Sequence, residues 1–125
     1  MKILCTFCSK EKVKNEGFLP AWKRYTSARI LSIRDTAHAS NIPFFILSGK
    51  HGLISEDKEI EYYDHLLSED SIQKIVSLVV GQIKESAVTE IIFYTRPEDT
   101  NLLPYLHVLE QATKELGIQF TVSSL

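Results

Sequence analysis

Four short apolar runs, separated by polar or amphipathic segments, constrain the fold of this chain more than any other feature. The runs cover residues 2–7, 44–47, 90–94 and 118–122, and their length and their β-branched or aromatic content indicate buried strands. Strands that alternate with helices favour parallel pairing with right-handed crossovers. We therefore expect an α/β fold, a three-layer α/β/α sandwich around a mostly parallel four-stranded sheet, with the strand order 2-1-3-4.

Helical periodicity fills the intervals between these runs. Apolar residues recur every three or four positions from about residue 21 or 27 to 40, from 72 to 83 and from 99 to 116, which is typical of helices with one buried face. Residues 48–68 show neither pattern. A connection of that length without secondary structure is uncommon in a compact domain and is often functional.

The composition narrows the class of protein without selecting a function. The 125 residues suit one domain, residues 1–125, which can bury a core without disulfides or metal ions to stabilise it. No apolar run approaches the roughly 20 residues of a membrane helix, and the first residues lack the apolar stretch of a signal peptide, so we expect a cytoplasmic protein with no membrane partner. The net charge of −2 argues against a broad duplex-DNA surface but allows a local cationic pocket.

Polar and cationic side chains follow the ends of the predicted strands. Ligands of open α/β sheets bind beyond the carboxyl ends of the strands, and hydroxyls with cations at that edge suit an anion such as phosphate. The alternative is that these are ordinary residues of surface loops. The residues in question are Cys8, Ser9, Lys10, Lys12, Ser48, Gly49, Lys50, His51, Gly52, Thr95, Arg96, Ser123 and Ser124.

The segment Ser48–Gly52 is the most informative local stretch. Gly49 and Gly52 bracket Lys50 and His51, and glycines allow a loop whose consecutive amides form an anion-binding nest. The P-loop spacing is absent. His51 has the side chain best suited to general acid or base catalysis near neutral pH. A simple turn that carries a solvated histidine is the alternative.

Two further pairs of residues are candidates for ligand contacts. Tyr63 could stack on a base, and Asp64 could orient His51 or bind a hydroxyl group, whereas a structural interpretation has Tyr63 packing the loop and Asp64 capping a turn. Tyr25 and Arg29 are four positions apart, so on one helical face near a helix N-terminus both could reach the same ligand. Packing of Tyr25 against the sheet is the alternative.

The two cysteines, Cys5 and Cys8, have the C-x-x-C spacing. This spacing supplies half of a zinc site at most, and we expect neither a metal nor another cofactor. Because both residues lie within a predicted strand, their thiols should point to opposite faces, with Cys5 in the core and Cys8 toward the pocket. A nucleophilic Cys8 with His51 as its base has no support from the spacing.

At these residues the sequence resembles an uncharacterised family of microbial and phage domains. The resemblance is carried by Cys8-Ser9-Lys10-x-Lys12, by Tyr25-Thr26-Ser27, by Phe45–Ile54 and by Ile60-Glu61-x-Tyr63-Asp64. The family pattern reads roughly cysteine-serine-x-x-lysine, leucine-serine-alanine-lysine-histidine-glycine-leucine-leucine and isoleucine-x-proline-tyrosine-aspartate. The same motifs are distantly similar to the YaaA peroxide-stress proteins and to the uracil-DNA-glycosylase-like domain of archaeosine-forming tRNA enzymes.

This resemblance implies a Rossmann-like or glycosylase-like α/β fold and a link to nucleotides or nucleic-acid bases. It favours functional roles for six residues. These are Lys10, Ser48, Lys50, His51, Tyr63 and Asp64. The chain departs from the family at Tyr62, which replaces the proline before the motif tyrosine.

Two functional hypotheses follow. The first is an enzyme that hydrolyses an N-glycosidic bond of a nucleotide or a nucleic-acid base, with His51 and Asp64 as the catalytic pair. The second is a non-catalytic module that binds a nucleotide or single-stranded nucleic acid, and an open sheet edge would allow a homodimer. In either case the expected substrate-binding residues are Cys8, Ser9, Lys10, Tyr25, Arg29, Ser48, Gly49, Lys50, Gly52, Tyr63 and Arg96.

Overall fold

A five-stranded mixed sheet organises the fold in the computed structural model, which describes residues 1–125. The strand order is β4-β3-β1-β6-β7. Strand β1 pairs in parallel with β3 and β6, β6 pairs in parallel with β7, and β4 runs antiparallel to β3. The strands are β1 (Lys2–Phe7), β3 (Phe44–Ser48), β4 (Gly52–Ser55), β6 (Glu90–Thr95) and β7 (Gln119–Ser124).

The four predicted strands are present in the predicted order, but the prediction of a four-stranded sheet is wrong. The additional strand, β4, lies within residues 48–68, which the sequence pattern leaves without structure. Leu53 and Ile54 are buried and pair with the end of β3, so two apolar residues after a tight turn suffice to extend the sheet. The same segment contains β5 (Glu59–Ile60), which pairs with β2 (Leu19–Pro20) in a small second sheet.

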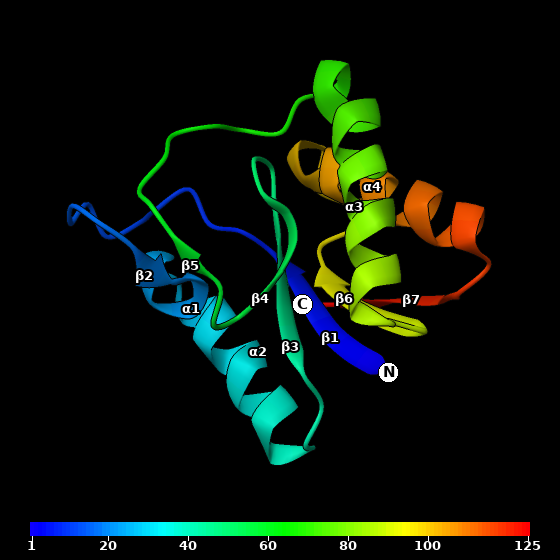
Figure 1. Cartoon of the computed structure of the whole chain (residues 1–125), viewed down its shortest axis with the longest axis horizontal. Helices are drawn as coiled ribbons and strands as arrows, with labels where there is room; N and C mark the ends of the chain where they lie inside the picture. Colours follow the sequence, from blue (N-terminus) through cyan, green and yellow to red (C-terminus); the bar gives the residue numbers. More distant parts are fainter.

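Four helices accompany the sheet. They are α1 (Ala21–Arg24), α2 (Ala28–Ala39), α3 (Ile72–Ser86) and α4 (Leu103–Leu116). Figure 1 shows α2 on one side of the strands and α3 with α4 on the other. No helix is long and apolar enough to cross a membrane.

The interval from residue 21 to 40 holds two helices where the periodicity predicts one. Tyr25 has an extended backbone that ends α1, and the Ser27 hydroxyl accepts a hydrogen bond from the Ile30 amide, which starts α2 anew. Tyr25 and Arg29 therefore do not share a helical face, and that prediction is wrong. At the end of α4, Gly117 has the left-handed conformation (φ 67°) expected of a helix-terminating glycine.

The core forms where the sheet meets these helices. The side chains of Ile3 and Cys5 on β1, Ile46 on β3, and Ile91 and Phe93 on β6 are fully buried. Burial raises the pKa of the Cys5 thiol, because an apolar environment penalises the thiolate. Cys5 is thus a core residue, as predicted, and both cysteines are free thiols.

Candidate functional site

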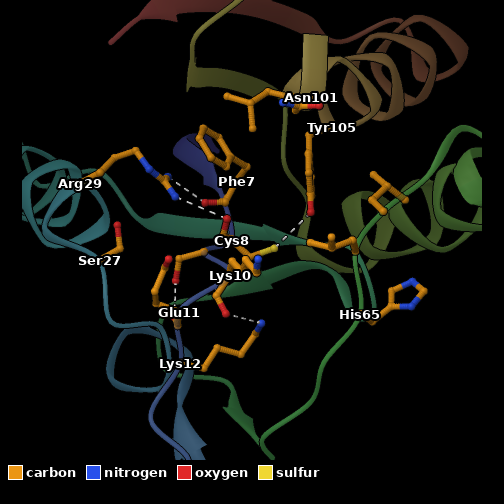
Figure 2. A pocket seen from close by; sticks show the side chains of 14 residues that line it. Phe7, Cys8, Lys10, Glu11, Lys12, Ser27, Arg29, His65, Asn101 and Tyr105 are labelled. Atoms are coloured by element: carbon orange, nitrogen blue, oxygen red, sulfur yellow. Dashed lines mark hydrogen bonds between the residues drawn. The ribbon is translucent and has the colours of Figure 1, made fainter. Parts of the chain in front are cut away.

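A cavity of about 470 Å³ lies beyond the carboxyl end of β1, and we call it the β1 pocket. Figure 2 shows that it is enclosed by the end of β1, the loop that follows it, the start of α2 and the start of α4. A volume of this size falls in the range of small-molecule sites. The lining residues are Phe7, Cys8, Ser9, Lys10, Glu11, Lys12, Ser27, Arg29, His65, Leu66, Leu67, Asn101, Leu102 and Tyr105.

Arg29, in the first turn of α2, is the most distinctive residue of the β1 pocket. Its Nη1 donates hydrogen bonds to the Thr6 hydroxyl at 2.7 Å and to the Phe7 carbonyl at 2.8 Å, and Nη2 donates to the Cys8 carbonyl at 3.4 Å. No carboxylate forms an ion pair with it. Burial lowers the pKa of Arg29 to about 10, and Arg96 adds to this effect. The guanidinium is still charged at neutral pH, so the pocket wall holds a half-buried cation without an ion-pair partner.

Two lysines add positive charge to the β1 pocket. Lys12 Nζ donates to the Lys10 carbonyl at 3.2 Å and lies 4.6 Å from the centre of the Tyr63 ring. Neither lysine forms an ion pair. Glu11 is the one carboxylate among the lining residues, so three cations face a single anion. The pocket is therefore cationic although the whole chain carries a net charge of −2.

Cys8 follows the last residue of β1 and lines this pocket. Its Sγ is 3.6 Å from the Tyr105 hydroxyl oxygen. Burial raises the pKa of Tyr105, so the phenol stays protonated at neutral pH. His51 makes no contact with Cys8, and the structure gives the thiol no histidine base.

A chain of buried hydroxyls lies beside the β1 pocket. The hydroxyl groups of Tyr25 and Tyr63 are 2.5 Å apart, and that of Tyr63 is 2.8 Å from the Ser48 hydroxyl. Burial raises the pKa values of both tyrosines. Tyr25 is 2% exposed and does not line the β1 pocket. Its ring packs edge-on against that of Tyr63, which agrees with the packing alternative for Tyr25 and not with a ligand contact.

The Ser48–Gly52 turn has its amides occupied from within. The Ser48 hydroxyl accepts hydrogen bonds from the amides of Lys50, at 3.1 Å, and His51, at 3.0 Å. These are two of the amides that an anion-binding nest would need, so the nest predicted for this turn is not formed. Ser48 instead links the turn to Tyr63.

The glycines of the turn serve packing. Gly52 has a φ of 74° and lies against the Gln82 side chain, which accepts a hydrogen bond from the Leu53 amide at 2.7 Å and donates one to the His51 carbonyl at 2.8 Å. A Cβ at Gly49 would lie 3.0 Å from the Leu67 backbone nitrogen. The positive φ favours glycine at position 52, and a Cβ at position 49 would crowd Leu67, so both glycines are explained without a ligand.

The proposed catalytic pair is not brought together. His51 Nε2 makes no hydrogen bond and lies 3.5 Å from a Glu61 carboxylate oxygen. Burial lowers the pKa of His51, while Glu61 opposes this effect. Glu61 also pairs with Lys50 at 2.9 Å. No hydrogen bond or ion pair joins His51 to Asp64, so Glu61, which sequence reasoning missed, is the carboxylate beside the imidazole.

Asp64 lines a second cavity of about 490 Å³, which we call the Asp64 depression. It shares His65 with the β1 pocket, so the two cavities adjoin at this residue. The depression is lined by Gly49, Lys50, Tyr62, Tyr63, Asp64, His65, Ser71, Lys74 and Ile75.

With this geometry in view, a comparison with protein families gives one match. The model of a family of unknown function, DUF6884, covers residues 3–121. The chain belongs to this family. The predicted resemblance to an uncharacterised family is confirmed, whereas the distant similarity to YaaA proteins and to glycosylase-like domains stays a prediction. No curated protein and no solved structure matches the chain.

In this DUF6884 member, the predicted site residues divide into three groups. Four line the β1 pocket: Cys8, Ser9, Lys10 and Arg29. Four others line the Asp64 depression: Gly49, Lys50, Tyr63 and Asp64. The remaining five line neither cavity: Tyr25, Ser48, His51, Gly52 and Arg96.

Several residues of the β1 pocket were not predicted from the sequence. Tyr105 belongs to the apolar face of α4 and has the periodicity of a core residue, although its hydroxyl marks it as able to bind a polar group. Asn101 and Leu66 have no local pattern at all. No group of three or more histidine, cysteine or acidic side chains is arranged to hold a metal ion.

Proposed function

We propose that the chain binds a phosphate-bearing small molecule, most naturally a nucleotide, in the β1 pocket. The proposal rests on Arg29, a half-buried cation that lines the pocket and forms no ion pair with a carboxylate. Removing a charged group from water is costly unless an anion or a full set of acceptors compensates. Arg29 Nε has no hydrogen-bond partner in the protein, and a phosphate would supply both charge and acceptor oxygens.

The architecture supports the same location. We infer a Rossmann-like, three-layer arrangement in which β1 is the central strand between β3 and β6. The chain leaves β1 for β3 on one edge and passes from β6 to β7 on the other. Ligands of doubly wound sheets bind at such a switch point, beyond the carboxyl ends of the strands. The β1 pocket lies there.

Calorimetric titration with pyrophosphate and with nucleoside mono-, di- and triphosphates at low salt tests this proposal. Lys10→Ala and Lys12→Ala should each weaken binding about three- to tenfold, because each removes one charge from a partly shielded site. Lys84→Ala, on the exposed face of α3, is the matched control and should leave affinity unchanged. The proposal fails if none of these ligands binds, or if the pocket variants match the control.

A short single-stranded oligonucleotide separates a free nucleotide from a nucleic-acid strand as the ligand. A strand that binds several cations releases several counterions, so its affinity should fall steeply with salt. The β1 pocket offers three cations in one place, and we expect the free nucleotide to compete fully with the oligonucleotide. An oligonucleotide that binds tightly and resists this competition would favour the strand-binding module.

N-glycosidic hydrolysis is a second candidate, favoured by the Asp64 depression. There an exposed carboxylate lies beside Tyr62, Tyr63 and Lys50, and a carboxylate near a ribose could stabilise developing positive charge on the sugar. Incubation with a nucleotide panel should then release free base, and Asp64→Asn should abolish the release, with Asp57→Asn as an exposed control. Absence of base release from every nucleotide would remove this candidate and leave the binding function.

A further inference from the structure

The β1 pocket has two chemically different ends. In Figure 2, Arg29 lies on one side of Phe7, whereas Asn101 and Tyr105 lie on the other. Lys10, Lys12, Leu66 and Leu102 line the same pocket. An inorganic phosphate would use the cationic end alone. The second end suits a ligand that also has a flat, largely apolar part.

Asn101 brings an unused amide to the second end. Its backbone nitrogen donates to the Asp99 carboxylate at 2.9 Å, but its side-chain oxygen and nitrogen have no hydrogen-bond partner in the protein. The amide is exposed on the turn that precedes α4. An adjacent donor and acceptor of this kind match the edge of a nucleic-acid base, as asparagine does when it reads adenine.

Leu66 is the second unusual residue of the pocket. Its side chain is 63% exposed although it lines the pocket, whereas its neighbour Leu67 is buried. Leu66, the half-buried Leu102 and Tyr105 all line the pocket and give it apolar surface. A base that covered this surface would remove the leucine from water.

From these observations we propose that the β1 pocket takes a nucleoside 5′-phosphate, with the phosphate at Arg29, the base against Leu66, Leu102 and Tyr105, and the base edge on the Asn101 amide. The inference rests on the proposed function and specifies its ligand. Because every natural base presents a neighbouring donor and acceptor, Asn101 selects a base over an abasic sugar phosphate and does not choose one base among four. Asn101 and Leu66 are thus the specificity-determining residues of the site.

Titration calorimetry with AMP, GMP, CMP, UMP and ribose 5-phosphate tests the proposal. We expect the four nucleotides to bind at least about tenfold more tightly than ribose 5-phosphate, because a site built to bind polar base atoms discriminates against ligands that lack them. Asn101→Ala and Leu66→Ser should each reduce this preference severalfold and leave the affinity for ribose 5-phosphate unchanged. Their matched controls are Asn15→Ala and Leu31→Ser, both exposed and outside the pocket.

The outcomes separate the inference from the function on which it rests. If ribose 5-phosphate binds as tightly as the nucleotides and both depend on Lys10, the base subsite is refuted while the phosphate-binding function stands. If no phosphate-bearing ligand binds at all, both fail. Because Asn101 and Leu66 are exposed, their variants should unfold at the same temperature as the wild type, which a thermal scan would verify.

Discussion

Arg24 and Arg29 are two arginines, five residues apart, of which Arg24 is buried and Arg29 half-buried, and neither forms an ion pair. Arg24 is 0% exposed, and its guanidinium donates five hydrogen bonds to the carbonyls of Val13, Asn15, Gly17 and Ile60. Arg29 makes three hydrogen bonds, the longest of them at 3.4 Å. All donors of Arg24 are used, whereas Arg29 retains unused donors at the wall of a cavity.

The difference between them indicates which charge is structural and which is available to a ligand. Backbone carbonyls take the place of water around the Arg24 guanidinium. Arg24 therefore holds the loop after β1 against β5 and has no free donor for a ligand. Arg29 holds the end of β1 in place but keeps positive charge and donor capacity facing the β1 pocket. Both the burial and the number of acceptors around each guanidinium distinguish the two.

The largest expected effect is on folding, from Arg24→Ala. Removing the guanidinium leaves several buried carbonyls without donors, and we expect a loss of at least about 3 kcal/mol in the free energy of unfolding. Urea denaturation at neutral pH measures it. Arg34→Ala, which breaks an ion pair with Glu56, is the control, with a loss of about 1 kcal/mol. Equal losses in the two variants would contradict the structural role of Arg24.

For Arg29→Ala we expect a large effect on ligand binding and a smaller effect on stability. Binding of nucleoside phosphates should weaken about 30-fold or more, because the phosphate loses a charge-assisted partner. The loss of unfolding free energy should be smaller than for Arg24→Ala, since water in the pocket can reach the freed carbonyls. Calorimetric titration and urea denaturation of the same preparation compare the two effects. Unchanged affinity would show that the free charge of Arg29 is not used for the ligand.

A smaller effect on the free energy of unfolding is expected from Tyr63→Phe, because the Tyr63 hydroxyl contacts the hydroxyls of Tyr25 and Ser48. Tyr63→Phe removes the central hydroxyl and leaves two buried hydroxyls with fewer partners, at a cost of about 1–2 kcal/mol. A double-mutant cycle with Tyr25→Phe should show clear non-additivity in urea denaturation. Tyr62→Phe is the matched control because that ring is exposed. Additive losses would mean that the hydroxyls are not coupled.

The smallest effect is a pH dependence that involves His51. Burial holds its pKa below the ordinary value of 6.5, so as the pH falls from 7 toward 5 the unfolded chain takes up the proton first and stability decreases. His51→Gln should flatten this decrease in urea denaturation across the same pH range. Glu61→Gln should steepen it, because that carboxylate favours the charged imidazole. Identical pH profiles for the wild type and the two variants would refute the role of His51 in this pH dependence.

Much of the fold could be predicted because it depends on local periodicity. The strands Lys2–Phe7 and Glu90–Thr95, the helix Ile72–Ser86 and the helix end at Gly117 all have patterns that a single segment carries. Strand β4 escaped prediction because two apolar residues give no periodicity. It becomes a strand only by pairing with β3, and that pairing is not encoded in the strand's own residues.

The candidate site was predictable in its position but not in its partners. The rule that ligands bind beyond the carboxyl ends of strands placed Cys8, Ser9 and Lys10 correctly in a cavity. It also pointed to the turn after β3, where the amides of Lys50 and His51 are already bound by Ser48. A loop sequence shows which groups are present, but it does not show whether the protein itself has already used them.

The sequence by itself determined an α/β chain with hydroxyls and cations at the strand ends. The tertiary structure decided which of these hydroxyls and cations remain unpaired, because pairing depends on contacts between residues that are distant in the sequence. Cys8 meets Tyr105 from 97 positions away, and Arg24 reaches Ile60 across 36. Short-range patterns record the preference of each segment for water or for the core. The acceptors that saturate Arg24 and leave Arg29 open are brought together only when the whole chain folds.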